Sequence, residues 1–402
     1  MRKHKLSDIF LIVSFVILCM GLPAAGAVIH RINGYETNDE NRRLSEFPKI
    51  NSVKDIEEFP SSFSNWYSDH MFLKPSLVKA KNEADIMLFS ELSSDDVVLG
   101  KNKNWLFYRS NDGQPLETYK RTNLFSEEEL EAVVDNLINL KNDVEDCGIK
   151  FVLMIAPDKE QVYGDELMPD RIKVADNKGI TNQLLDALKN ADPDFTVVYP
   201  LEALKAGRTE QQLYYETDTH WNMLGAEIAC SELFNVILKD SIGSESNQLK
   251  ASDDINTFAE ENVIHRNTYT SEKSKLGDLQ KLVKLGDKYN STEFKPVADF
   301  ERKLISEEKD NNNGEVIWEH YNSLSESSVP IKVYVTGDSF RWHLSPFIEQ
   351  TAQDTVITSR YYFDTDDLLN EEPDVFVYET AERYIHDLGM IPGYNTAALV
   401  NN

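Results

Sequence analysis

The stretch "VYVTGDSFRWHLSPF" (residues 333–347) joins an apolar run, a sharp turn and a helix-like segment. Residues 333–335 show the uninterrupted apolar character of a strand that is covered on both faces. The Gly-Asp-Ser tripeptide at 337–339 ends that strand, and a helical pattern begins near Trp342. In an open α/β sheet, ligands bind at the carboxyl ends of the strands. The junction therefore places a serine hydroxyl where a nucleophile would be useful.

The rest of the chain repeats this alternation of strand and helix. A capping box at Ser126 and Glu129 starts an amphipathic helix that ends near Gly148. Further apolar strands are expected at 150–157, 195–201, 355–362 and 373–383, a strand, turn and strand at 97–108, and helices at 179–191 and after residue 220. Such alternation predicts an α/β fold with a mostly parallel sheet and helices on both faces.

The N-terminal sequence has the pattern of an export segment. A basic start, "MRKHK" (1–5), precedes an uncharged apolar run at 9–29 that is long enough to cross a bilayer. The "AGA" at 25–27 would also suit a cleaved signal peptide, although the length of the run favours an uncleaved anchor. The expected organisation is a signal anchor or signal peptide at 1–30, a linker and helical segment at 31–95, and a catalytic-type domain at 96–402. A polar insertion is expected at about 240–330.

Composition and cysteine usage exclude several classes of function. There are 69 acidic and 41 basic side chains, which gives a formal net charge of −28. Such a charge repels nucleic acid and anionic lipid headgroups, so neither is expected as a partner. Beyond the anchor, Cys147 and Cys230 lie in apolar helical patterns, which favours buried thiols over a disulfide. So few cysteines argue against a metal site, and no cofactor is expected.

A second stretch, "YYETDTHWNMLGAEIA" (214–229), supplies an acid and a histidine two residues apart. It too lies between a strand-like segment and a helix. His220 can accept the proton of Ser339 during attack on an acyl carbonyl, and Asp218 can orient the imidazole. Residues two apart in an extended segment point to the same side, so both groups can face one nucleophile.

Each motif also has a purely structural explanation. Gly-Asp-Ser is a common turn, and Ser339 can serve as the N-cap of the following helix. Asp-x-His pairs are mostly solvated turns. Metal binding by Asp218 and His220 is a further alternative, but no nearby second histidine or cysteine completes a ligand set. The catalytic interpretation gains weight because both motifs interrupt strand-to-helix junctions of one sheet.

Taken together, the motifs resemble the SGNH-hydrolase-like domain of alginate O-acetyltransferases of the AlgX/AlgJ type, and of the related DHHW proteins. The resemblance spans most of the exported chain, and in this family the acid–histidine pair precedes the serine, as here. Thr219 stands where DHHW proteins have a histidine, which brings the chain nearer to the AlgX/AlgJ branch. The segments that carry the resemblance are "ENRRLSEFP", "SDHMFLKPSLV", "GKNKNWLFY", "APDKEQVYGDELMP", "YYETDTHWNMLGA", "GDL" (277–279), "VTGDSF" and "PDVFVYETAER".

The resemblance implies an enzyme of the bacterial cell envelope that moves acetyl groups onto a cell-surface or secreted polysaccharide. Ser339 matches the nucleophile that carries a transient acetyl ester, His220 the general base and Asp218 its partner. Gly337 and Asp338, in the same turn, are candidate oxyanion or substrate contacts. A membrane-bound O-acyltransferase (MBOAT) is implied as the acetyl donor, and the N-terminal helix as the membrane anchor. The glycan itself is not identified, and alginate is not inferred.

Other residues are weaker candidates for oxyanion or substrate contacts. Tyr215 and Trp221 flank the acid–histidine pair, although core packing is the simpler role for Trp221. Glu379 and Arg383 match a recurrent ending of the last strand, where they form either an internal ion pair or a substrate contact. Arg341 either touches a sugar or faces solvent. Two alternatives to the transferase stay open: an acetylesterase that uses water as the acceptor, and a non-catalytic glycan-binding or assembly scaffold.

Overall fold

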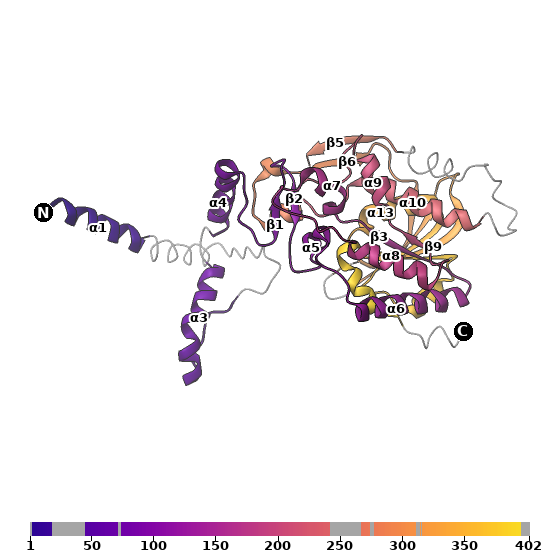
Figure 1. Ribbon diagram of the computed structural model, residues 1–402, viewed down its shortest axis with the longest axis horizontal. Coiled ribbons are helices and arrows are strands. Elements are labelled where there is room, and N and C mark those ends of the chain that lie inside the picture. Colours follow the sequence, from indigo (N-terminus) through magenta and orange to yellow (C-terminus); the bar gives the residue numbers. More distant parts are fainter. Residues whose placement is uncertain are drawn as a thin grey trace. The chain divides into compact units, whose positions relative to one another are not determined.

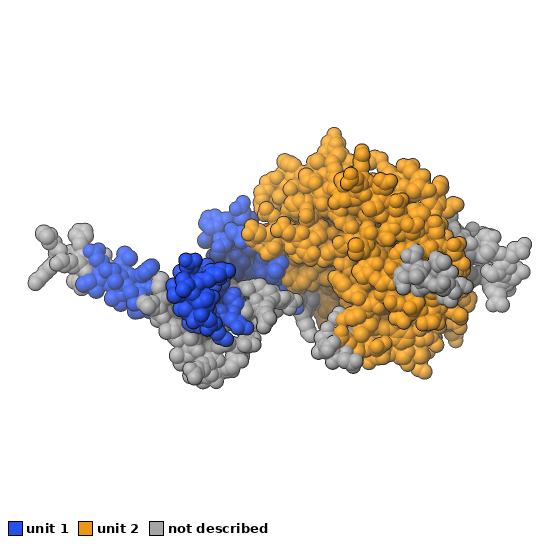
Figure 2. Space-filling model, turned by 90° about the horizontal axis from the view of Figure 1, so that it is seen from below, with its two compact units in different colours: residues 1–93, 280–286 blue, residues 94–279, 287–402 orange. Residues whose placement is uncertain are grey.

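The computed structural model describes residues 2–17, 45–70, 74–241, 267–273, 277–310, 314 and 316–394. The chain divides into two compact units, which Figure 2 shows in blue and orange. Unit 1 consists of residues 1–93 and 280–286, and unit 2 of residues 94–279 and 287–402.

Unit 1 is helical. Its main helices are α1 (Arg2–Val16), α3 (Val53–His70) and α4 (Lys74–Phe89). Within the described residues, we find no helix with the length and apolar character needed to span a membrane. The apolar segment expected at 9–29 begins in α1, and its remainder from residue 18 lies outside the described residues.

Unit 2 is built around a seven-stranded sheet with the strand order β4-β3-β11-β9-β10-β8-β7. The first five of these strands pair in parallel, and β8 and β7 pair antiparallel at one edge. The expected mostly parallel sheet is therefore confirmed. The strands are β3 (Lys150–Ala156), β4 (Val197–Val198), β7 (Arg302–Lys309), β8 (Val316–Ser323), β9 (Val329–Gly337), β10 (Ala352–Ser359) and β11 (Val375–Ala381).

The antiparallel edge comes from the region expected to be a polar insertion. β7 and β8 lie within residues 240–330, yet they extend the central sheet. Most side chains of β7 are exposed, so its sequence lacks the apolar run that marks β3. An edge strand needs backbone hydrogen bonds on one side only, and it tolerates charged side chains. A polar stretch can therefore be a strand of the main sheet.

Helices cover both faces of the sheet, as expected (Figure 1). Alternate residues of β3 divide between two apolar cores: Val152 and Met154 face one core, and Phe151 and Leu153 face the other. The first core contains side chains of α7 (Lys159–Leu167), α9 (Leu201–Gly207), α10 (Met223–Ser241) and α13 (Arg341–Thr351). The second contains those of α6 (Glu127–Asp146), α8 (Ile180–Ala191), α14 (Thr365–Glu371) and η4 (Glu382–Gly389).

Several local predictions are confirmed. Ser126 and Glu129 form the expected capping box at the start of α6. Cys147 and Cys230 form no disulfide, as expected; Cys230 is buried, whereas Cys147 is only half-buried and so departs from the expected burial. The expected strand–turn–strand is β1 (Val97–Leu99) paired antiparallel with β2 (Leu106–Tyr108). The remaining elements are α5 (Pro115–Lys120), β5 (Tyr269–Lys273), α12 (Asp278–Leu282), η3 (Asp287–Tyr289) and β6 (Thr292–Pro296).

Candidate active site

The acid–histidine pair lies at the tip of a hairpin-like loop, residues 213–222. Tyr214 and Trp221 form an antiparallel bridge, and the N–H of Asn222 donates to the carbonyl of Leu213 (2.9 Å). The Asn222 side-chain oxygen then accepts the N–H groups of the first turn of α10, which fixes the start of that helix. The loop is therefore held at both of its ends.

The structure brings Asp218, His220 and Ser339 together in one hydrogen-bonded chain. His220 Nδ1 lies 2.6 Å from Asp218 Oδ1, and His220 Nε2 lies 2.7 Å from Ser339 Oγ. Both distances are within the range of a general base that contacts its nucleophile. The arrangement places the acid on one ring nitrogen and the serine hydroxyl on the other. It has the geometry of a nucleophile, a base and an orienting acid.

The turn that carries Ser339 is anchored by buried carboxyl groups. Asp338 accepts the N–H of Phe340 (3.0 Å) and that of Ala381 (2.7 Å), so it joins the turn to the end of β11. Glu379 accepts the N–H of Asp338 (3.0 Å). A Cβ at Gly337 would lie 2.3 Å from Glu379 Oε2, so only glycine fits there. Three residues that the sequence suggested as substrate or oxyanion contacts instead fix the shape of this turn: Gly337, Asp338 and Glu379.

Ser339 does not cap the helix that follows it. The N-cap of α13 is Phe340, which makes no side-chain cap, and the helix begins at Arg341. Within the described part of the chain, the backbone N–H of Ser339 meets no acceptor. That N–H is therefore available to the former carbonyl oxygen of a substrate whose carbonyl carbon the Ser339 oxygen attacks.

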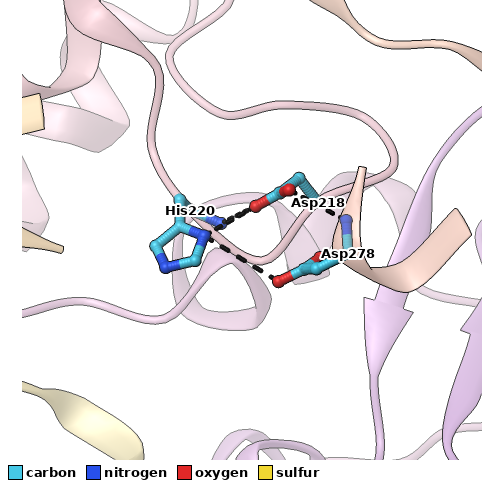
Figure 3. Close-up of side chains that lie close together, drawn as sticks. All are labelled: Asp218, His220 and Asp278. Carbon is cyan, nitrogen blue, oxygen red and sulfur yellow. Dashed lines mark hydrogen bonds and ion pairs between the residues drawn. The ribbon is translucent and has the colours of Figure 1, made fainter. Parts of the chain in front are cut away.

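A second carboxylate, which sequence analysis did not single out, lies beside the histidine. Asp278 Oδ2 is 3.8 Å from His220 Nδ1, and its carboxylate accepts the N–H and the hydroxyl of Thr219 (2.9 and 2.6 Å). The N–H of Asp278 in turn donates to Asp218 Oδ2 (2.9 Å). Figure 3 shows both carboxylates on the Nδ1 side of the ring, with the other ring nitrogen pointing away. Asp278 stands in the quoted "GDL" segment, but nothing in that tripeptide indicates its role.

A buried lysine is the other residue that sequence analysis missed. Lys159 is 1% exposed, and its ammonium donates to the carbonyls of Tyr215 (3.1 Å), Glu216 (3.2 Å) and Asp218 (2.6 Å). One cation at the start of α7 therefore holds the loop that carries the acid. The segment "APDKEQVYGDELMP" includes this lysine, but a single charged residue in an amphipathic pattern looks like a surface residue.

The two carboxylates have opposite pKa shifts. Burial alone would raise the pKa of Asp218. The hydrogen bond to His220, the positive charge of protonated His220 and the hydrogen bond from the Asp278 N–H together outweigh burial, so the pKa of Asp218 lies below its ordinary value. Burial raises the pKa of Asp278, and repulsion by Asp218 adds to the shift. Asp218 is therefore the carboxylate that stays ionised to orient the imidazole.

The remaining sequence candidates are mostly buried. Trp221 is fully buried, and its indole N–H donates to the carbonyl of Phe340 (3.1 Å), which ties the histidine loop to the serine turn. Arg341 does not face solvent, one of its two expected positions, because it is buried and donates to two carbonyls of the turn. Arg383 forms an internal ion pair with Asp158 (2.6 Å). Each of these three buried side chains stabilises the protein structure around the site through an internal hydrogen bond or ion pair.

Tyr215 contacts a histidine that the sequence did not mark. The Tyr215 hydroxyl lies 3.2 Å from His343 Nε2. Burial lowers the pKa of His343 to about 4, and the nearby His220 adds to the shift. His343 is therefore neutral at physiological pH, and the imidazole that contacts Ser339 is that of His220.

Asp218, His220 and Asp278 also lie close enough together to hold a metal ion, because their ligand atoms are within 4.8 Å of one another. All three already have protein partners: His220 Nδ1 meets Asp218, and Asp278 accepts from Thr219. A metal at Nδ1 would displace the Asp218 hydrogen bond. The donor set thus fits an oriented imidazole better than a metal site.

Replacing Asp278 by asparagine is expected to lower the turnover number by roughly 10- to 100-fold, because weaker hydrogen bonds to Thr219 loosen the histidine loop. The acceptor KM should change little, since Asp278 acts through His220. Steady-state turnover, compared with the exposed matched variant Asp176→Asn, measures the effect. A rise in KM at unchanged turnover would show that Asp278 contacts substrate instead.

Comparisons with known proteins agree with this architecture. A family model described as "SGNH hydrolase-like domain, acetyltransferase AlgX" matches residues 97–360, more than half of the chain. A probable alginate O-acetylase AlgJ of Pseudomonas fluorescens is 25% identical over 304 residues, which cover 68% of this chain and 70% of that protein. The corresponding protein of Pseudomonas syringae pv. tomato is 24% identical over 335 residues, 76% of this chain and 73% of its own.

Among solved structures, the O-acetyltransferase domain of Pseudomonas putida AlgJ matches with a TM-score of 0.43 and 17% identity, covering 76% of this chain and 99% of that domain. The sequence match over residues 97–360 contains the loop with Asp218 and His220 and the turn with Ser339. The chain belongs to the AlgX family of acetyltransferases, which is characterised by the SGNH hydrolase-like domain.

Proposed function

We propose that this protein is an extracytoplasmic enzyme that transfers acetyl groups to hydroxyls of a polysaccharide through an acetyl ester on Ser339. The observation that carries the proposal is the continuous chain from Asp218 through His220 to the Ser339 hydroxyl, with links of 2.6 and 2.7 Å. Family membership supports the acetyl chemistry.

In the first half-reaction, Ser339 Oγ attacks the carbonyl carbon of an acetyl donor. Its proton passes to His220 Nε2, while Asp218 stabilises the resulting imidazolium from the Nδ1 side. The Ser339 N–H can hold the negative oxygen of the tetrahedral intermediate. When the intermediate collapses, the donor's leaving group takes the proton from Nε2 and departs, and Ser339 keeps the acetyl group.

The second half-reaction runs the same steps with a sugar hydroxyl. His220 Nε2 accepts the proton of that hydroxyl as its oxygen attacks the acetyl carbon. The tetrahedral intermediate then expels Ser339 Oγ, which recovers the proton from Nε2. The acetylated sugar leaves, and the enzyme returns to its starting state. If water reaches the acetyl-serine before the sugar does, the same steps release acetate instead.

A membrane-bound partner would supply the acetyl groups. The basic start and the apolar run at 9–29 support an N-terminal anchor that keeps the enzyme near a membrane-bound O-acyltransferase partner. Such a partner would deliver acetyl groups across the membrane to Ser339, with no soluble cofactor.

Brief incubation of the purified protein with 4-nitrophenyl acetate is expected to add one acetyl group to Ser339, which peptide mass spectrometry would locate. The imidazole at 2.7 Å is the physical reason, because it activates this hydroxyl above ordinary serines. A mixture of oligosaccharides should then accelerate loss of the label and yield acetylated sugar. Label loss that is unaffected by sugar would indicate an esterase, and absence of label would contradict the catalytic proposal.

A further inference from the structure

Aromatic rings and guanidinium groups alternate in a row that starts at the catalytic histidine. The ring centroid of Phe340 lies 4.9 Å from that of His220. The guanidinium carbon of Arg383 lies 5.1 Å from the Phe340 ring and 5.3 Å from the Tyr384 ring. We call Phe340, Arg383, Tyr384, Arg360 and Tyr361 the aromatic row.

The outer end of the aromatic row, Tyr361, reaches solvent. The guanidinium carbon of Arg360 lies 4.5 Å from the Tyr384 ring and 5.1 Å from the Tyr361 ring. The N–H of Arg360 donates to the carbonyl of Gly337 (2.9 Å), so this end is tied to the turn that carries Ser339. Tyr361 is 70% exposed. A large ring is thus held in water beside the nucleophile turn.

A second exposed ring lies near the same turn. Trp342 is 51% exposed, and its ring lies 4.5 Å from the guanidinium carbon of Arg341. That guanidinium donates to the carbonyls of Gly337 and Asp338. One exposed aromatic residue is ordinary on a protein surface. Here there are two, each stacked on an arginine that hydrogen-bonds to residue 337 or 338, Arg360 by its backbone N–H and Arg341 by its guanidinium. Each ring offers a surface on which a flat, partly apolar group such as a sugar ring can stack, and we call the two rings the platform.

The two arginines of the aromatic row are already paired with carboxylates. Arg383 is paired with Asp158 at 2.6 Å, and Arg360 lies 3.5 Å from Asp387. Asp387 is itself exposed, and Asp112 accepts the Tyr384 hydroxyl (3.2 Å). The cations of the aromatic row therefore have carboxylate partners within the protein, and a polyanionic sugar chain would meet further carboxylates. Like charges brought together in this way oppose binding.

We propose that the acceptor is an uncharged polysaccharide whose sugar rings stack on Tyr361 and Trp342 while one hydroxyl reaches the acetyl group on Ser339. This inference rests on the proposed function and adds to it the chemical class of the acceptor. It predicts that a polyuronate such as alginate, the substrate in the names of the curated relatives, is a poor acceptor here.

The test offers acetylated full-length protein two acceptors of equal length, an uncharged oligosaccharide (from glucan, mannan or xylan) and an oligo-mannuronate. Transfer to at least one uncharged oligosaccharide is expected to be about tenfold or more faster than transfer to the uronate. The KM for the uncharged oligosaccharide should be insensitive to ionic strength, because this acceptor forms no charge pairs with the protein. Faster transfer to the uronate, or transfer to neither class, would overturn the inference.

Variants of the two exposed rings test the platform directly. Tyr361→Ala and Trp342→Ala are each expected to raise the KM for the uncharged acceptor about tenfold by removing a stacking surface. Leu304→Ala, an exposed apolar residue on the edge strand β7, is the matched control and should leave KM unchanged. Unchanged KM in both ring variants would overturn the inference. Labelling of Ser339 is measured separately. If the proposed function is wrong, Ser339 carries no label. If only the inference is wrong, Ser339 is labelled but the enzyme does not prefer the uncharged acceptor.

Discussion

Ser339→Ala is expected to lower acetyl transfer by roughly 10⁴-fold or more, the scale of loss when a covalent nucleophile is removed. The fold should survive, because Ser339 does not cap α13 and its hydroxyl contacts only the imidazole of His220 in the described residues. The free energy of unfolding should therefore change by less than about 1 kcal/mol. Activity and stability separate cleanly at this position.

The measurement is the acetyl content of an oligosaccharide acceptor, with thermal unfolding followed in parallel. Ser345→Ala is the matched control, because that hydroxyl lies in α13, the helix that follows the turn, and donates to the carbonyl of Arg341 (2.8 Å). The control should transfer acetyl groups at the wild-type rate. If Ser339→Ala retains transfer, the catalytic proposal is wrong, and the non-catalytic scaffold becomes the better account of this fold.

The fold was predictable wherever burial leaves a pattern in the sequence. The apolar run at 150–157 and the Ser126–Glu129 box each depend on residues close together in the chain. The edge strand β7 could not be found in the same way, because its side chains are largely exposed and its place is set by pairing with β8. Backbone pairing, unlike burial, leaves little trace in side-chain type.

Some residues of the candidate site could likewise be predicted from the sequence, and others could not. Ser339 stands out because a polar turn interrupts a strand-to-helix junction of the sheet. The expectation of a second such junction is wrong for Asp218 and His220, which lie in the hairpin-like loop between α9 and α10. Asp278 acts from sixty positions beyond Asp218, and its partners are a backbone N–H and a threonine hydroxyl. Residues that support a site through backbone contacts carry no motif, so only coordinates reveal them.

Lys159 is the support whose loss is expected to have the largest effect on stability. Its ammonium satisfies three carbonyls of the loop that carries Asp218, and it lies 5.6 Å from the ring of Phe107. Lys159→Met keeps most of the volume and removes every donor. A buried acceptor without a partner costs about 1–3 kcal/mol. The Glu216 carbonyl keeps the N–H of Leu106 (2.8 Å), so the substitution leaves the carbonyls of Tyr215 and Asp218 without a donor. The free energy of unfolding should therefore fall by roughly 2–6 kcal/mol.

Activity should fall with stability in Lys159→Met, because the same carbonyl contacts fix the loop on which Asp218 orients His220. Chemical denaturation gives the change in unfolding free energy, and acetylation of Ser339 by 4-nitrophenyl acetate, measured well below the unfolding midpoint, gives the change in activity. The exposed Lys189→Met in α8 is the matched control and should change neither. A Lys159→Met protein with wild-type stability and labelling rate would mean that the loop keeps its shape without the cation. The main-chain pairing of Tyr214 with Trp221 would then be sufficient to position the acid and the histidine.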